Sequence, residues 1–225
     1  MPGACWPTRR STRPATHYGF SGPQEVFDTA ERLGRAHALD TICRAAILAR
    51  AASLPPDALL FLNVSPQTLE HGVLAGDTLV AAVAAAGLAP ERVVLEITER
   101  SLARLPAVVR EALRLRGLGF RLALDDVGAG NAGLEMLSQV PVDFIKVDCA
   151  VVAQAATDTT ADAVLAAVVA FAAKTGSRVV AEGIETVAMV EHVRGAGVAC
   201  AQGYLLGRPD AALAPTPPLP QTLSA

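Results

Sequence analysis

The segment RLALDDVGAGNAGLEMLSQVPVDFIKVD, residues 121–148, decides the fold class of this chain. It contains an apolar run at Arg121–Asp126, a short helical pattern at Asn131–Gln139 and a second apolar run at Phe144–Asp148. Strongly apolar strands that alternate with helices are typical of a parallel sheet covered by helices. The segment therefore predicts an α/β fold.

The same alternation extends on both sides of this segment. Apolar runs predict four more strands, at Leu59–Val64, Val93–Thr98, Arg178–Glu182 and Ala199–Tyr204. Helical patterns separate the strands, and the clearest of them are Pro23–Ala51, Pro66–Ala86, Leu105–Arg116, Thr160–Gly176 and Val187–Gly195. We expect one domain at residues 22–209 that forms most of a (β/α) barrel. Residues 1–21 show no periodic pattern and residues 210–225 are a Pro-rich tail, so both ends are predicted to be irregular.

Composition excludes several classes of protein. The chain has 225 residues and a net charge of −3 without a basic stripe, which argues against binding to polymeric nucleic acid. No apolar run is long enough to cross a bilayer and no secretory signal is recognisable, so we expect a cytoplasmic protein. The four cysteines, Cys5, Cys43, Cys149 and Cys200, are too scattered to predict a zinc site or a disulfide framework.

Polar side chains stand at the ends of nearly all the predicted strands. The carboxyl ends of parallel barrel strands converge on one rim, where active sites are built. A single Asp at such a position is often only a helix N-cap, and for the Asp125–Asp126 pair considered alone both explanations remain open. Capping cannot easily explain six strands in succession, so we expect one crevice lined by Asn63, Glu96, Thr98, Asp125, Asp126, Lys146, Asp148, Glu182 and Gln202.

The chemistry of these side chains favours a divalent metal site. Carboxylate and amide oxygens without His or Cys suit Mg²⁺ or Mn²⁺, and the adjacent Asp125 and Asp126 could bridge two ions. The chain has only two lysines, Lys146 and Lys174. Lys146 could donate a hydrogen bond to a water or phosphate oxygen, or it could form a buried ion pair with Asp148 or Asp126, and the two roles are compatible.

One motif points elsewhere. Gly128, Gly130 and Gly133 follow a strand with the spacing of a dinucleotide-binding fingerprint. Three features disfavour that function: two carboxylates beside the expected pyrophosphate, a following helix cut short by Pro141, and three strand–helix units ahead of the motif.

Six ordered blocks carry a resemblance to a known family. They are FLNVS (61–65), LEITE (95–99), LDDVGAGNAGLEML (124–137), VPVDFIKVD (140–148), VVAEGIET (179–186) and AQGYLLGRP (201–209). In this order they resemble the successive motifs of EAL domains, and residues 22–47 are similar to the helix that follows that family's signature strand. The resemblance implies a (β/α)8 barrel of the TIM type and a bacterial cyclic-di-GMP phosphodiesterase that produces linear diguanylate with two Mg²⁺ or Mn²⁺ ions.

The resemblance also implies roles for individual residues. It makes Asn63, Glu96, Asp125 and Asp126 metal ligands. It makes Lys146, Glu182 and Gln202 the catalytic group: Lys146 orients the attacking water, Glu182 is a ligand or general base, and Gln202 lies near the water. Glu185 is expected to support the loop after the paired aspartates, and Asp148 is a further candidate for contacting the substrate.

The chain departs from the family in two places. The family barrel begins with two strands, the second of which carries the Glu-Ala-Leu signature with its metal-binding Glu, and neither is found ahead of Gly22. The loop at residues 128–133 reads GAGNAG instead of the usual GTGYSS, which questions dimerisation through that loop. Two hypotheses follow: a phosphodiesterase domain, or a degenerate domain that binds cyclic di-GMP and regulates. A homodimer and fused signalling domains in a longer parent protein are possible partners.

Overall fold

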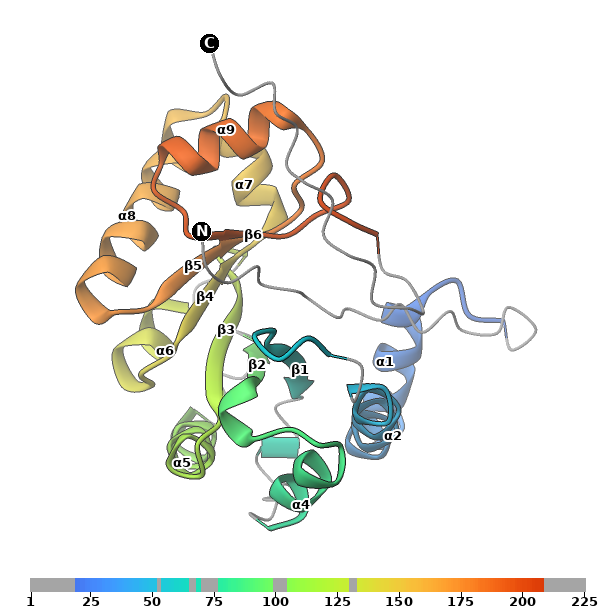
Figure 1. The fold of residues 1–225 in the computed structure, drawn as a ribbon. Helices are drawn as coiled ribbons and strands as arrows, with labels where there is room; N and C mark the ends of the chain where they lie inside the picture. The colour runs from blue at the N-terminus through green and yellow to red at the C-terminus, as the bar shows by residue number, and fades with distance from the viewer. Residues whose placement is uncertain are drawn as a thin grey trace.

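The computed structural model describes residues 19–51, 54–64, 68–69, 77–98, 105–129 and 133–208 (Figure 1). Most of the two end segments predicted to be irregular, residues 1–18 and 210–225, lies outside this part of the chain. The elements, in chain order, are α1 (Pro23–Arg32), α2 (Ala36–Leu48), β1 (Leu60–Val64), α4 (Asp77–Ala85), η3 (Pro90–Arg92), β2 (Val93–Thr98), α5 (Leu105–Gly117), β3 (Arg121–Val127), α6 (Gly133–Gln139), β4 (Phe144–Val147), α7 (Cys149–Ala155), α8 (Thr159–Thr175), β5 (Arg178–Ala181), α9 (Val187–Gly195) and β6 (Cys200–Ala201).

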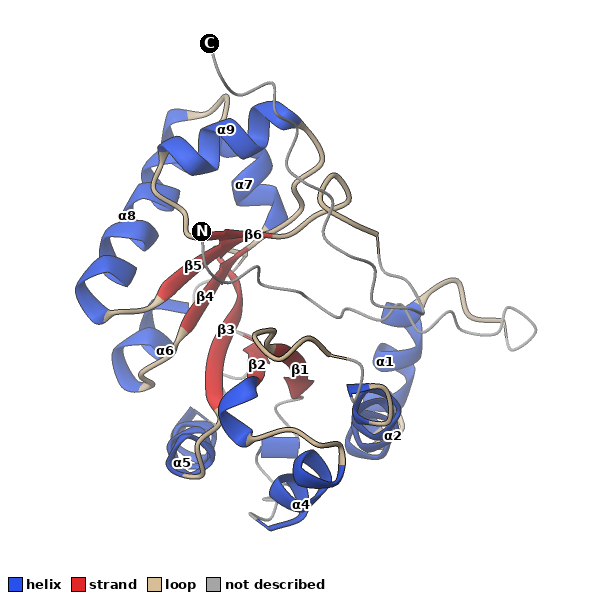
Figure 2. Cartoon of the chain, in the orientation of Figure 1, coloured by secondary structure: helices blue, strands red, loops and turns tan. Residues whose placement is uncertain are grey.

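The strands form one parallel sheet in the order β1-β2-β3-β4-β5-β6, so each strand pairs with its neighbour in the sequence. Figure 2 shows the strands near the centre of the molecule, with α5, α6, α8 and α9 on their outer side. Among the described residues β1 and β6 are the two edges of the sheet, which is therefore a barrel wall that does not close on itself. The predicted α/β fold with six barrel-like strands is confirmed.

Two predicted elements differ from the structure. The helix expected at Pro23–Ala51 is two helices, because the chain turns between α1 and α2 and Gly34 takes a φ of 65° that an α-helix does not allow. The strand expected at Ala199–Tyr204 is only the two residues of β6. Beyond Ala201 the chain leaves the sheet in a turn, closed by the hydrogen bond from the Gly207 amide to the Gly203 carbonyl.

The sheet is apolar on both faces. Its outer face packs against the helices through a large cluster of buried side chains that includes Leu62, Leu95, Leu122 and Ile145, none of which exposes any surface. Burial of each such side chain stabilises the fold by about 1.5–3 kcal/mol. Its inner face carries a second, smaller buried cluster, which consists of Phe61, Val94, Ala123, Phe144, Val180 and Cys200.

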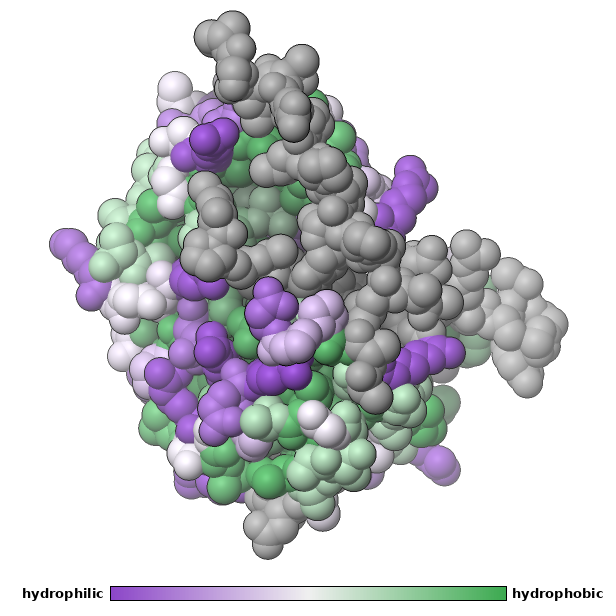
Figure 3. Space-filling model, in the orientation of Figure 1, coloured by the Kyte–Doolittle hydropathy of each residue, from purple (hydrophilic) through white to green (hydrophobic). Residues whose placement is uncertain are grey.

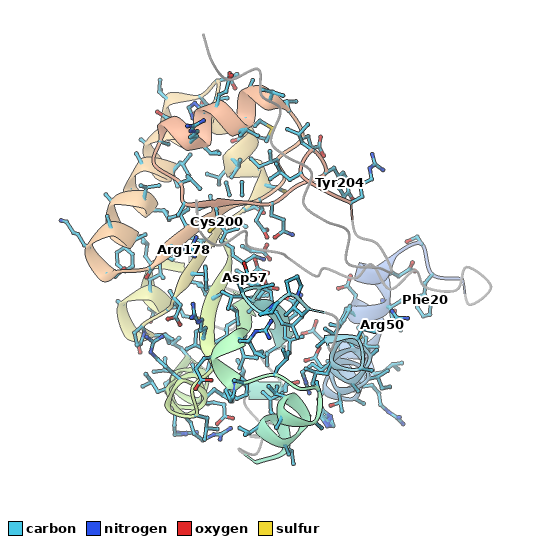
Figure 4. All side chains as sticks on the ribbon, viewed as in Figure 1. Phe20, Arg50, Asp57, Arg178, Cys200 and Tyr204 are labelled. Carbon is cyan, nitrogen blue, oxygen red and sulfur yellow. The ribbon has the colours of Figure 1, made fainter. Side chains whose placement is uncertain are left out.

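The inner cluster marks the layer directly below the predicted site. Each of its six residues stands two positions before a predicted site residue. For β1 to β4 both residues lie on the same strand and point to the same face, while Glu182 and Gln202 directly follow the ends of β5 and β6. Figure 4 labels two residues at this layer, Arg178 on β5 and Cys200 on β6. The Arg178 guanidinium donates to the Cys200 sulfur at 3.0 Å and lies 5.7 Å from the centroid of the Phe144 ring.

Figure 3 shows hydrophilic side chains gathered near the centre of the face in view, with apolar side chains below them over α4. In the part of the chain that the structure describes, no helix alone has the length and apolar character to cross a membrane. Only α7 and α8 taken together, with a bend of 118° at the break between them, meet that test by length and composition.

Candidate active site

A β-bulge presents the two adjacent aspartates of β3. Leu124 pairs with Ile145 and Val127 pairs with Val147, so Asp125 and Asp126 together lie opposite Lys146 alone. Adjacent side chains of a regular strand point to opposite faces, whereas a bulge re-aims one of them. Asp126 has a φ of 61° and is the one non-glycine residue with positive φ in the described part of the chain. Asp tolerates this conformation better than most residues.

Lys146 contacts two carboxylates from neighbouring strands and one from the residue that directly follows β5. Its Nζ lies 2.7 Å from Glu96 Oε1, 2.6 Å from Asp125 Oδ1 and 2.6 Å from Glu182 Oε1. The Lys146 and Asp125 side chains are each 1% exposed, Glu96 is 3% exposed and Glu182 is 9% exposed. Lys146 was expected to pair with Asp148 or Asp126, whereas the ion pairs seen are with Glu96, Asp125 and Glu182. Asp148 instead caps α7.

The gathering of carboxylates at this point favours a cation. Glu96, Asp125 and Glu182 converge on Lys146 and are nearly buried, and buried carboxylates typically pair with cations or coordinate metals. Asp125, Asp126 and Glu182 each offer one oxygen, and these oxygens lie within 4.8 Å of one another. Such a group of oxygens suits Mg²⁺ or Mn²⁺. The residues present therefore fit the expected divalent ion.

The pKa of a neighbouring thiol reports the same negative field. Burial raises the pKa of Cys149, and the carboxylates of Asp148, Glu182 and Asp126 raise it further. A negative charge near a thiol disfavours its thiolate form. Cys149, the first residue of α7, packs against Gly183, which directly follows Glu182 of this cluster.

Asn63 and Gln202 complete the predicted set at the two edges of the sheet. Asn63 is exposed on β1 and stands directly beside Glu96 in the register of β1 and β2. The backbone N–H of Gln202 donates to the Ala181 carbonyl at 2.8 Å, which places Gln202 beside the end of β5. Its side-chain Oε1 is buried and has no hydrogen-bond partner among the described residues. A buried acceptor of this kind suits a water or ligand that donates to it.

Two expected residues lie at the margin of the cluster. Asp148 is the N-cap of α7, and its Oδ1 accepts from the Ala150 amide at 2.8 Å. Glu185 is exposed between β5 and α9, and no hydrogen bond or ion pair to it is seen in the described part of the chain. The loop that it was expected to support is described only as far as Ala129, so that role stays a prediction.

The chain contains one Glu-Ala-Leu tripeptide, at Glu111–Leu113, but it lies on α5. Glu111 accepts two hydrogen bonds from the Arg114 guanidinium, at 2.8 and 2.6 Å. A Glu held in this way on a covering helix does not replace a metal ligand at the end of a strand.

Sequence reasoning missed how the site is held together. It did not identify Glu96 and Glu182 as the partners of Lys146, and it gave no role to Cys149, Gly183 or Gly203. A signal was present, because Glu182 and Gln202 are each followed directly by a glycine. The dinucleotide fingerprint gains no support, since α6 has only seven residues.

Comparison with known proteins assigns the family. Residues 14–209 match the family model of the EAL domain. The chain belongs to the EAL domain family. Cyclic di-GMP phosphodiesterase RocR of Pseudomonas aeruginosa is 38% identical over 151 residues, which are 67% of this chain and 38% of RocR. An uncharacterized signaling protein of Caulobacter vibrioides is 36% identical over 194 residues, which are 85% of this chain and 24% of that protein.

Solved structures of EAL proteins share the fold. BlrP1 of Klebsiella pneumoniae, in a complex with manganese and cyclic di-GMP, superimposes with a TM-score of 0.75 at 34% identity. The match covers 83% of this chain and 48% of the BlrP1 chain. This chain matches less than two fifths of the length of RocR and of the Caulobacter relative.

Proposed function

We propose that this EAL domain hydrolyses cyclic di-GMP to linear diguanylate by metal-dependent phosphodiester hydrolysis. The observation that carries the proposal is the buried contact of Lys146 with Glu96, Asp125 and Glu182, beside the bulged Asp126. The name of RocR, and the ligands bound to BlrP1, support cyclic di-GMP as the substrate.

Two Mg²⁺ or Mn²⁺ ions would be held by the oxygens of five residues: Asn63, Glu96, Asp125, Asp126 and Glu182. Bound there, the ions supply positive charge to the attacking and leaving oxygens of an in-line displacement at phosphorus. The buried oxygen of Gln202 fits this arrangement, because a water held at the site can donate to it.

The chain's own residues position the water and receive its proton. With ions holding the carboxylates, one N–H group of Lys146 would leave its carboxylate and donate a hydrogen bond to the oxygen of the attacking water or of the phosphate. As that oxygen bonds to phosphorus, a water proton passes to Glu182, which lies beside the Lys146 ammonium. The bond from phosphorus to the ribose 3′-oxygen breaks, and the leaving oxygen takes a proton from solvent.

One observation favours a second function, a regulatory domain that binds cyclic di-GMP without turnover. The only Glu-Ala-Leu tripeptide of the sequence lies on α5, so the ligand that the family takes from its signature strand is not supplied by it. The proposal also includes a cytoplasmic location, a homodimer and further signalling domains in a longer protein. The small share of RocR and of the Caulobacter relative that is matched supports the last of these.

Single-turnover hydrolysis tests the proposal. The full chain, in excess over cyclic di-GMP and with Mn²⁺, should form the linear dinucleotide, and Glu182→Ala should abolish its formation. Glu191→Ala, which changes an exposed carboxylate on α9, is the matched control and should behave as the unmodified chain. Calorimetric binding of cyclic di-GMP without turnover would favour the regulatory function. If the chain neither binds nor hydrolyses cyclic di-GMP, both functions are contradicted.

A further inference from the structure

The turn after β6 lies directly against the backbone of Ile184. The Ile184 amide donates to the Gln202 carbonyl at 2.9 Å, and the Leu205 amide donates to the Ile184 carbonyl at 3.1 Å. A Cβ atom added to Gly203 would overlap the amide nitrogen, carbonyl carbon and carbonyl oxygen of Ile184, closer than real Cβ atoms come. Only glycine leaves room for this approach.

The same segment is held from its other side by the start of α7. Gly183 has a φ of 69°, and a Cβ added there would overlap the Cys149 Cβ and lie 3.3 Å from the Cys149 Cα. The rim segment Glu182–Ile184 therefore lies directly against both Cys149 and Gly203. Both contacts involve backbone or Cβ atoms, which cannot turn aside as the end of a long side chain can.

Each glycine directly follows a proposed site residue: Gly183 follows Glu182, and Gly203 follows Gln202. We propose that Gly183 and Gly203 are positioning residues, which allow α7 and the turn after β6 to close on the rim segment and so fix Glu182 and Gln202 relative to each other. The inference rests on the proposed function, because it assigns the purpose of this packing to the same site.

Packing at Gly203 is separable from backbone conformation. Its φ lies outside the left-handed region, so another residue could adopt its backbone angles. What excludes a side chain is the nearness of Ile184. Gly207 stands in the same turn, also outside the left-handed region, and a Cβ there would meet no atom within 4 Å. The chain thus supplies a matched control for the substitution.

The test compares Gly203→Ala with Gly207→Ala in single-turnover hydrolysis of cyclic di-GMP and in Mn²⁺ titration. We expect Gly203→Ala to lower the maximal rate at least about tenfold, because displacements of ~1 Å can cost about a hundredfold in rate. The cyclic di-GMP concentration that gives half the maximal rate should stay within about threefold of its value in the unmodified chain. Gly207→Ala should match the unmodified chain. A folded Gly203→Ala protein with the rate and Mn²⁺ affinity of Gly207→Ala overturns the inference.

A second pair of variants covers two other outcomes. If Gly203→Ala does not fold, Gly183→Ala should lower the rate relative to Gly176→Ala, whose glycine also has a positive φ, of 77°, but whose added Cβ would meet no atom within 4 Å. Equal rates in these two variants overturn the inference. If the unmodified chain shows no turnover, the proposed function fails. In that case Mn²⁺ affinity still tests the positioning role of Gly203. An affinity at least about threefold lower in Gly203→Ala than in Gly207→Ala supports this role, and equal affinities refute it.

Discussion

At the scale of single residues, Glu96, Asp125 and Lys146 lie on β2, β3 and β4, Glu182 directly follows β5, and all four side chains are nearly inaccessible to solvent. Replacement of Lys146 by Met should lower the free energy of unfolding by about 3–5 kcal/mol without metal, because it leaves buried carboxylates without their ammonium. Lys174→Met changes the only other lysine, which is exposed on α8, and should cost less than about 0.5 kcal/mol. Urea denaturation in EDTA measures both values. Equal stability of the two variants would mean that Lys146 does not stabilise the cluster.

Asp125 tests the metal at the same scale. Asp125→Asn keeps the shape of the side chain and removes one negative charge among oxygens that lie within 4.8 Å of one another. Mn²⁺ affinity measured by calorimetry should therefore fall at least about tenfold, since hard cations prefer carboxylate ligands. Asp162→Asn, on α8, should leave the affinity unchanged. Identical Mn²⁺ affinities in the two variants would assign Asp125 a purely structural role.

At the scale of elements, the bulge in β3 depends on the positive φ of Asp126. Asn tolerates this conformation nearly as well as Asp, whereas a β-branched residue does not. Asp126→Asn should therefore keep the stability of the unmodified chain to within about 0.5 kcal/mol, and Asp126→Val should lose about 1–2 kcal/mol. Denaturant unfolding of both variants without metal measures this. If Val is tolerated as well as Asn, the bulge does not constrain residue 126.

Strand positions were predictable from the sequence and the contacts between strands were not. Apolar runs predicted β2 to the residue and β1 to within one residue, because buried parallel strands are continuously apolar. The partners of Lys146 depend on how far each strand is shifted against the next: Glu96 stands beside Ala123, and Thr98 stands beside Asp125. The apolar pattern carries no record of that shift or of the bulge.

At the scale of the whole molecule, β1 and β6 are the unpaired edges of the sheet within the described residues. The family resemblance implies two more strands ahead of β1, one of them with a metal-binding Glu. A two-strand segment of an EAL barrel fused ahead of Gly22 should therefore raise turnover of cyclic di-GMP by about a hundredfold, because it fixes the metals and the water more closely. The same fusion with Glu182→Ala is the control and should stay inactive. An unfused chain as fast as the fusion would show that the added strands are not needed for turnover.

We propose that the strand ends around Lys146 form a divalent metal site. Anomalous X-ray scattering from crystals grown with Mn²⁺ and cyclic di-GMP, recorded at the manganese absorption edge, tests it most directly. We expect manganese peaks in contact with the carboxylates of Asp125, Asp126 and Glu182. Well-ordered crystals of the complex without a peak at these three residues, or with manganese only elsewhere on the chain, would contradict it.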